Sequence, residues 1–303
     1  MSSRRTTIDG RTLSVSNLDK VLYPVTATTK AEVIAYYLEV AEVMLPHLAG
    51  RPVTFRRFPD GVRAEAFYQK HCPGHRPDWL PTVPLGREGR REVVDHCDIR
   101  EPAALAWAAN LGALEFHVPM ARASDAGAPT AVVFDLDPGA PAGLVACAEV
   151  AMTLHELFDQ LGLIAVAKTS GGKGLQVYLP VDPAGSSYAA TRGFAHAVAQ
   201  LLQAQQPDRI VTTQARSERP GKVLIDWMQN HRTKTTVCAY SLRGRERPTA
   251  STPVTWEEVE RAVREQSDVG LRFEFGSIGG RIRERGDLFE PVAQLRQRLP
   301  ELS

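Results

Sequence analysis

The sequence lacks any long uninterrupted hydrophobic run. No stretch approaches the roughly 18 apolar residues that a membrane-spanning helix needs. The two arginines near the start are not followed by the apolar segment of a secretory signal, so we expect a cytoplasmic protein with no membrane partner. Hydrophobic residues make up 43% of the 303 positions and charged residues 23%. These values exclude wholesale disorder and allow one large domain or two fused halves.

Cysteine is also scarce. The four cysteines, Cys72, Cys97, Cys147 and Cys238, show no CxxC spacing, and we expect free thiols rather than a disulfide framework in a cytoplasmic chain of this size. The segments 71–75 (HCPGH) and 96–97 (HC) leave a structural zinc site open as an alternative, because zinc accepts Cys and His ligands. Their spacing matches no standard zinc finger.

The chain has almost no net charge, but its charges are unevenly distributed. The total is +1, which excludes little. Between residues 209 and 247 the basic side chains outnumber three acids; they are Arg209, Arg216, Arg219, Lys222, Arg232, Lys234, Arg243, Arg245 and Arg247. This segment could form a phosphate-binding surface or simply a solvated basic face.

Hydrophobic periodicity predicts alternating helices and strands. We expect helices over 28–48, 102–112, 143–161, 186–206 and 256–266, and strands over 51–58, 114–118, 130–137, 163–170, 175–180 and 223–228. The Pro- and Gly-rich stretch 69–91 should form loops. Because some strands follow one another through a turn alone, the pattern favours an α+β fold with mixed β-sheets flanked by helices.

Two aspartates interrupt the apolar strand TAVVFDLD. Asp135 and Asp137 are two residues apart, so both carboxylates should project from the same face of the strand. Like charges in an apolar strand are costly without a cation, and Mg²⁺ and Mn²⁺ prefer carboxylate oxygens. Asp226 interrupts VLIDWM in the same way. Three acids on neighbouring strands could hold two divalent ions for an in-line phosphoryl displacement.

A glycine turn, KTSGGKG at 168–174, separates two expected strands. It is not a Walker A motif, because no Ser or Thr follows Lys173 and a strand comes next instead of a helix. The turn could be purely structural. Alternatively, its backbone N–H groups, the Ser170 hydroxyl and the Lys173 ammonium could bind a triphosphate.

Three motifs occur in a fixed order: FDLDPG, TSGGKGLQVYLP and VLIDWMQN. Together they resemble the signature motifs of archaeo-eukaryotic primase-type polymerases, and most closely the polymerase domain of bacterial ligase D. The flanking segments SNLDKVLYP, GRPVTFRRFPDG, LEFHVP and KTTVCAYSLRGR extend the resemblance over about residues 13–295. It implies a primase-polymerase fold as a single domain over 1–303, with a DNA-binding N-terminal part (about 1–125), a catalytic core (about 126–250) and a C-terminal helical tail (about 251–303).

The resemblance also implies roles for individual residues. Asp135, Asp137 and Asp226 would be the catalytic metal ligands, and the nucleotide would be bound by Arg56, His117, Ser170, Lys173, Gln176 and Arg243. DNA would be bound by Asn17, Lys20 and Lys30 at a 5′-phosphate, by Tyr68 near the template and by Arg219 near the primer terminus. Taken alone, His117 would more often be a core histidine than a nucleotide ligand.

One position departs from the family pattern. The second motif of the family usually reads GLHVY, whereas this chain has Gln176 in place of the histidine. Glutamine can donate a hydrogen bond to phosphate but cannot carry positive charge or transfer a proton. We therefore expect reduced rather than abolished activity.

The resemblance implies a template-directed polymerase that uses two Mn²⁺ or Mg²⁺ ions and NTP or dNTP substrates, with ribonucleotides preferred. It would fill short gaps in non-homologous end joining with Ku and a DNA ligase, in trans or in the same parent protein. Two alternatives remain: a non-catalytic module that binds 5′-phosphorylated DNA ends, and a metal-dependent nuclease, which would leave the glycine turn without a purpose.

Overall fold

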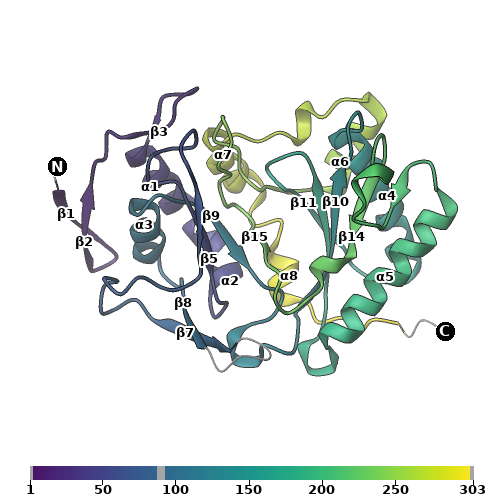
Figure 1. Ribbon diagram of the computed structural model, residues 1–303, viewed down its shortest axis with the longest axis horizontal. Coiled ribbons are helices and arrows are strands. Elements are labelled where there is room, and N and C mark those ends of the chain that lie inside the picture. The colour runs from purple at the N-terminus through teal and green to yellow at the C-terminus, as the bar shows by residue number, and fades with distance from the viewer. Residues whose placement is uncertain (1–2, 87–92, 301–303) are drawn as a thin grey trace. The chain divides into compact units, whose positions relative to one another are not determined.

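The computed structural model describes residues 3–86 and 93–300 (Figure 1). The chain divides into two compact units, each assembled from three segments. The first unit comprises Met1–Pro119, Val237–Ser251 and Glu274–Gly286; the second comprises Met120–Thr236, Thr252–Phe273 and Asp287–Ser303. Both units contain helices and sheets, and the second has both parallel and antiparallel strand pairs, which confirms the predicted α+β class.

Short sheets and four helices make up the described part of the first unit. Its strands are β1 (Ser3–Ile8), β2 (Arg11–Ser16), β3 (Val21–Tyr23), β4 (Thr28–Thr29), β5 (Thr54–Arg57), β6 (Phe67–Gln69), β7 (Thr82–Gly86), β8 (Val93–Cys97) and β9 (Ala113–Val118). Its helices are α1 (Lys30–Glu39), α2 (Ala41–Leu48), α3 (Pro102–Asn110) and α7 (Phe275–Arg285). The largest of its sheets has the order β15-β9-β5-β6, in which β15 (Thr236–Val237) includes the division between the units.

The helix predicted over 28–48 is two helices. Thr29 caps α1 in a capping box, in which its side chain accepts from the Glu32 N–H and the Glu32 side chain accepts from the Thr29 N–H. The backbone leaves the helical conformation at Val40 (ψ 2°), where α1 ends and α2 begins. The apolar periodicity from which the helix was predicted did not reveal this break.

A six-stranded sheet forms the centre of the second unit. Its order is β13-β14-β10-β12-β11-β16, and only the β13–β14 pair is parallel. The strands are β10 (Ala131–Pro138), β11 (Val166–Thr169), β12 (Leu175–Pro180), β13 (Ile210–Val211), β14 (Val223–Asp226) and β16 (Pro253–Val254). The helices are α4 (Leu144–Gln160), α5 (Tyr188–Gln205), α6 (Trp256–Glu265) and α8 (Glu290–Gln294).

The two faces of this sheet differ in chemistry. On β10, Val132, Phe134 and Leu136 are completely buried and belong to the same core cluster as residues of α4, α5 and α6. Figure 1 shows α4 and α5 to one side of β10 and β14. Side chains alternate along a strand, so Asp135 and Asp137 project from the opposite face. Helices α4, α5 and α6 thus pack on the apolar face of the sheet, and the aspartates project from the opposite face.

Three local predictions were wrong. Cys72 and Cys97 form a disulfide, whereas Cys147 and Cys238 are buried thiols. The predicted loop over 69–91 contains β7, which pairs with β8 in a two-stranded sheet, while positions 87–91 of that prediction lie outside the described residues. The strand predicted over 223–228 ends at Asp226, because the Asp226 side chain accepts from the Met228 N–H and caps a short 3₁₀ helix (Trp227–Gln229).

Within residues 3–86 and 93–300, no helix is both long enough and apolar enough to cross a bilayer.

Candidate functional site

A row of polar residues crosses four strands on the face of the six-stranded sheet opposite to α4, α5 and α6. Asp135 of β10 is paired in register with Asp226 of β14 on one side and with Gln176 of β12 on the other. Gln176 is in turn paired with Lys168 of β11. Directly paired residues lie on the same face of a sheet. In order across the sheet, the row consists of Asp226, Asp135, Gln176 and Lys168. Asp137 lies two residues after Asp135 on the same face of β10.

The acids in this row repel one another. Burial and the neighbouring charge of Asp137 raise the pKa of Asp135 to about 7, and Asp226 adds to this effect. A hydrogen bond from the Gln176 amide partly offsets it. Asp226 is only 8% exposed. The protein alone thus supplies too little positive charge to stabilise Asp135 fully as a carboxylate.

The donor set fits a hard divalent cation. It consists of carboxylate oxygens, the ligands that Mg²⁺ and Mn²⁺ prefer, and a cation would relieve the repulsion between Asp135 and Asp137. The Asp226 oxygens accept from the Met228 N–H and from Gln229 Nε2 at 3.1 and 3.2 Å; each keeps lone-pair capacity for a metal. In the described part of the chain, however, no group of three or more His, Cys, Asp or Glu side chains is arranged closely enough to hold an ion.

Gln176 is held at both ends of its amide. Its Oε1 accepts from Lys168 Nζ at 2.5 Å and from the Tyr178 hydroxyl at 3.3 Å, and its Nε2 donates to Asp135 Oδ1 at 3.0 Å. The Tyr178 hydroxyl oxygen also lies 3.0 Å from Thr236 Oγ1. Lys168 and Gln176 are only 1% and 3% exposed. The amide therefore connects a buried ammonium to a carboxylate of the acidic row.

The glycine turn lies next to the acids. The Ser170 hydroxyl accepts from the N–H groups of Gly172 and Gly174, both at 3.2 Å, and this closes the turn. A Cβ at Gly174 would lie 2.3 Å from the Leu136 carbonyl oxygen and 3.3 Å from Asp137 Oδ1. Only glycine permits this approach to β10. Lys173 is exposed, so its ammonium can reach an anion beside the turn.

In the first unit, a second cluster surrounds the Glu115 carboxylate. Arg56 Nη1 donates to it at 3.1 Å, His117 Nε2 lies 2.8 Å from it, and Arg243 Nε lies 3.5 Å from it. Burial by itself would raise the pKa of Glu115, but the His117 hydrogen bond and the Arg243 charge lower it to about 2. Burial lowers the pKa of His117, although the Glu115 contact opposes that effect. Three of the predicted nucleotide-binding residues are thus brought together by one acid.

An aromatic edge strand adjoins this cluster. Tyr68 of β6 is 60% exposed, and its ring lies 5.7 Å from the Arg56 guanidinium and 5.7 Å from the His117 ring. Phe67, also exposed, lies 5.2 Å from the Arg57 guanidinium. Exposed aromatic rings beside arginines suit stacking on nucleic-acid bases.

The predicted 5′-phosphate residues lie close together in the first unit. Lys30 Nζ donates to the Ser16 carbonyl at 2.6 Å, and the Lys30 N–H donates to the Lys20 carbonyl at 2.8 Å. Asn17 follows Ser16 in a turn with positive φ (52°). Lys20 also forms a 2.6 Å ion pair with Asp60. Burial, followed by repulsion from Lys20, lowers the pKa of Lys30 to about 8, as expected for two adjacent ammonium groups.

Arg219 lies in a loop of the second unit that packs against Gly139, just after the end of β10. Its guanidinium donates to Gln214 Oε1 at 2.5 Å. A Cβ at Gly139, two residues after Asp137, would lie 2.0 Å from the Arg219 carbonyl oxygen. This glycine allows the loop to approach the end of β10 closely.

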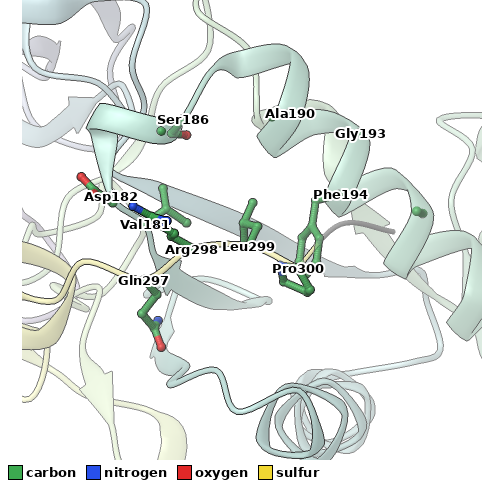
Figure 2. Close-up of a pocket in the computed structure, with 12 residues that line it drawn as sticks. Val181, Asp182, Ser186, Ala190, Gly193, Phe194, Gln297, Arg298, Leu299 and Pro300 are labelled. Atoms are coloured by element: carbon green, nitrogen blue, oxygen red, sulfur yellow. The ribbon is translucent and has the colours of Figure 1, made fainter. Parts of the chain in front are cut away.

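A cavity of about 730 Å³ lies elsewhere in the second unit. It is lined by the segment that follows β12, by α5 and by the C-terminal segment, including Ser186, Phe194 and Leu299 (Figure 2). Gln297 holds this segment through bonds to the Ile164 and Pro180 carbonyls at 2.9 and 3.1 Å. None of the predicted site residues lines the cavity, so we do not assign the chemistry to it.

The structure groups the predicted residues by unit. The second unit contains the three aspartates, Gln176, the glycine turn and Arg219. The first unit contains Arg56, His117, Arg243, Tyr68 and the predicted 5′-phosphate residues Asn17, Lys20 and Lys30. Sequence reasoning missed Glu115, Lys168 and Phe67. Glu115 and Lys168 each interrupt an apolar strand, which is the signal that identified the aspartates.

Comparison with known proteins gives consistent matches. Residues 29–289 match the family model described as LigD, primase-polymerase domain. The multifunctional non-homologous end joining protein LigD of Mycolicibacterium smegmatis is 42% identical over 281 residues, which cover 92% of this chain and 36% of that protein. The bifunctional LigD of Bacillus subtilis is 32% identical over 274 residues, covering 90% and 43%.

A solved structure agrees as well. The polymerase domain of Mycobacterium tuberculosis ligase D in complex with DNA superimposes with a TM-score of 0.85 and 39% identity. The match covers 93% of this chain and 98% of that one. The chain thus spans well under half the length of the curated LigD relatives but nearly all of the solved polymerase domain.

Proposed function

Because the chain belongs to the LigD primase-polymerase domain family, we propose that it is a template-directed nucleotidyltransferase. It extends primer ends and fills short gaps in DNA during non-homologous end joining, with ribonucleotides preferred. It works in the cytoplasm with Ku and a DNA ligase, in trans or in the same parent protein. The single observation that carries this proposal is the polar row of the second unit, with Asp137 and the glycine turn beside it.

Asp135, Asp137 and Asp226 would hold two Mg²⁺ or Mn²⁺ ions. When bound, these ions supply charge stabilisation at the attacking and leaving oxygens of an in-line displacement. The carboxylates fix the position of that charge, and Gln176 holds Asp135 in one orientation through its 3.0 Å hydrogen bond. Catalysis by positioning and charge stabilisation needs no separate general base.

The nucleotide would be bound through its phosphates. Lys173 supplies an ammonium at the glycine turn, and Ser170 keeps the N–H groups of the turn in place. In the first unit, Arg56 and Arg243 present guanidiniums, and His117 presents an imidazole. Guanidinium groups suit phosphate because they donate two parallel hydrogen bonds.

DNA would be bound by three further groups. Asn17, Lys20 and Lys30 form the patch for a 5′-phosphate. Tyr68 offers an exposed ring for stacking on a template base, a contact that contributes roughly 1–3 kcal/mol per base. Arg219 is assigned to the primer terminus, and its loop packs against Gly139 at the end of the acidic strand.

Extension of a labelled primer across a short gap tests this function. The substrate is prepared with and without a 5′-phosphate at the far side of the gap, and each NTP and dNTP is supplied with Mn²⁺ or Mg²⁺. We expect extension that requires metal, favours NTPs and weakens without the 5′-phosphate. Binding without extension in either metal would leave a DNA-end-binding module. Short products released without added nucleotide would indicate a nuclease instead.

A further inference from the structure

Glu115 is a buried acid in a strand that is otherwise mostly apolar. All six residues of β9 are buried, and the Glu115 side chain is 1% exposed. β9 is flanked in its sheet by β5, and Arg56 of β5 is the in-register partner of Glu115. A buried carboxylate is costly unless its oxygens are satisfied by donors. The Glu115 carboxylate therefore needs donors among its neighbours.

Both carboxylate oxygens are engaged. Oε1 accepts from Arg56 Nη1 at 3.1 Å and from the Gly244 N–H at 2.9 Å, and Arg243 Nε lies 3.5 Å away. Oε2 is 2.8 Å from His117 Nε2. Donors thus come from β9 itself, from β5 and from the segment after β15. One carboxylate fixes the relative positions of three side chains that are distant in sequence.

Other contacts restrict these side chains further. The Arg56 guanidinium lies 5.0 Å from the Phe58 ring and 5.7 Å from the Tyr68 ring. The Arg243 carbonyl accepts from the buried Tyr23 hydroxyl at 2.9 Å. At Gly244, a Cβ would overlap the Phe58 ring at 1.9 Å, so glycine is needed for the 2.9 Å bond to Glu115.

The cluster keeps a surplus of positive charge. Arg56 and Arg243 carry two permanent charges against the single charge of Glu115. Burial, and then repulsion from Arg243 and Arg56, lower the pKa of Arg245, which places a third guanidinium within electrostatic range. A site with this balance suits a multiply charged anion such as a triphosphate. Glu115 therefore orders the cations without neutralising them.

We propose that Glu115 is a positioning residue for nucleotide binding: it holds Arg56, Arg243 and His117 in the arrangement that receives the triphosphate. The identity of the anion rests on the proposed function. Charge alone would predict the opposite behaviour, because removing a negative group from a basic site strengthens anion binding. The two accounts thus differ in the direction of the effect.

Glu115→Gln tests the proposal, because glutamine keeps the size of the side chain and its amide oxygen can still accept from Arg56. The matched control is Glu101→Gln, which removes a surface acid paired with Arg11 at 3.1 Å. ATP binding in the presence of Mn²⁺ and steady-state primer extension are measured for both variants. We expect Glu115→Gln to raise the Kd and KM for ATP about tenfold or more, since charge-assisted hydrogen bonds are lost. The change in kcat should be smaller, and Glu101→Gln should match the wild type.

Binding of ATP by Glu115→Gln as tight as in the wild type, or tighter, would overturn the proposal. A second readout does not depend on polymerase activity: the titration of His117 followed by NMR. The groups facing His117 are Glu115, Arg56, Arg243 and Tyr68. Loss of the Glu115 charge should lower the pKa of His117, and an unchanged titration would also overturn the positioning role. A wild type that neither binds ATP nor extends a primer would instead contradict the proposed function.

Discussion

Lys30 illustrates how neighbouring charges prepare a side chain for an anion. Burial, and then repulsion from Lys20, lower its pKa to about 8, far below that of an ordinary lysine. A phosphate close to its ammonium would stabilise the charged form and relieve that repulsion. The charged form of Lys30 is therefore poorly stabilised in the unbound protein, and a 5′-phosphate would stabilise it.

This shift predicts a pH dependence of DNA-end binding. Because the charged form of Lys30 is lost as the pH rises through about 8, the affinity for a 5′-phosphorylated gap should fall above that pH, by up to about tenfold per pH unit. Fluorescence anisotropy between pH 7 and 9.5 measures it. Lys30→Arg should remove the dependence, since arginine stays charged, and DNA with a 5′-hydroxyl is the second control. Equal affinity for both DNA ends at every pH would contradict the role of Lys30.

Lys168 and Gln176 form one hydrogen-bonded unit with Asp135. Lys168→Met should lower the free energy of unfolding by about 1–3 kcal/mol, because it leaves the buried Gln176 Oε1 without its strongest donor. Denaturant unfolding measures the change, with the exposed Lys173→Met as control. Combining Lys168→Met with Gln176→Leu should cost less than the sum of the two single changes. If the two single losses of unfolding free energy added up strictly, the 2.5 Å hydrogen bond between Lys168 Nζ and Gln176 Oε1 would contribute nothing to stability.

At the scale of elements, the turn between β11 and β12 depends on one glycine. An alanine Cβ at position 174 would lie 2.3 Å from the Leu136 carbonyl oxygen, so the turn and β10 would have to separate. Gly174→Ala should lower the free energy of unfolding by about 1–3 kcal/mol and displace the turn from Asp137. Denaturant unfolding and ATP binding are the measurements. Gly185→Ala, where a Cβ meets nothing within 4 Å, is the control, and equal behaviour of the two variants would contradict this account.

The sequence predicted strands and helices well where local signals were strong. The side-chain alternation predicted that Asp135 and Asp137 share one face of their strand, and the helix predicted over 256–266 is found as α6 (Trp256–Glu265). β7 was missed because Pro84 and the surrounding Pro and Gly residues indicate loops, although a two-stranded sheet tolerates a proline without full ladder bonding. The partners of Glu115 and Lys168 come from distant segments, and no local pattern reveals such contacts.

At the scale of the whole chain, the Cys72–Cys97 disulfide connects segments that are 25 residues apart. A cross-link of this span stabilises mainly by restricting the unfolded chain, by about 3 kcal/mol. Cys72→Ser should therefore lower the melting temperature, and dithiothreitol should lower that of the wild type to a similar value. Cys147 is buried and not cross-linked; dithiothreitol should therefore have no effect on Cys72→Ser. If dithiothreitol left the melting temperature of the wild type unchanged, the stabilising role of the Cys72–Cys97 disulfide would be contradicted.

Sequence spacing could not predict this disulfide. The β7–β8 pairing places Thr82 opposite Cys97, and the Cys72 N–H donates to the Asp95 carbonyl at 2.8 Å. These contacts bring the two sulfurs together only after the chain has folded. In contrast, the order of the three motifs in the sequence was sufficient to predict the family, and each motif contains all or part of a strand of the six-stranded sheet.

The most direct test of the central claim is metal-dependent nucleotide incorporation by the wild type, Asp135→Asn and Asp137→Asn, with Asp182→Asn as control. Asp182 caps a short 3₁₀ helix (Pro183–Gly185) and is not part of the polar row. We predict that the wild type and Asp182→Asn extend a gapped primer with Mn²⁺. Either substitution in the row should reduce the rate by at least about a thousandfold, as expected when electrostatic stabilisation of the transition state is lost. Extension by Asp135→Asn and Asp137→Asn at the wild-type rate would contradict the account.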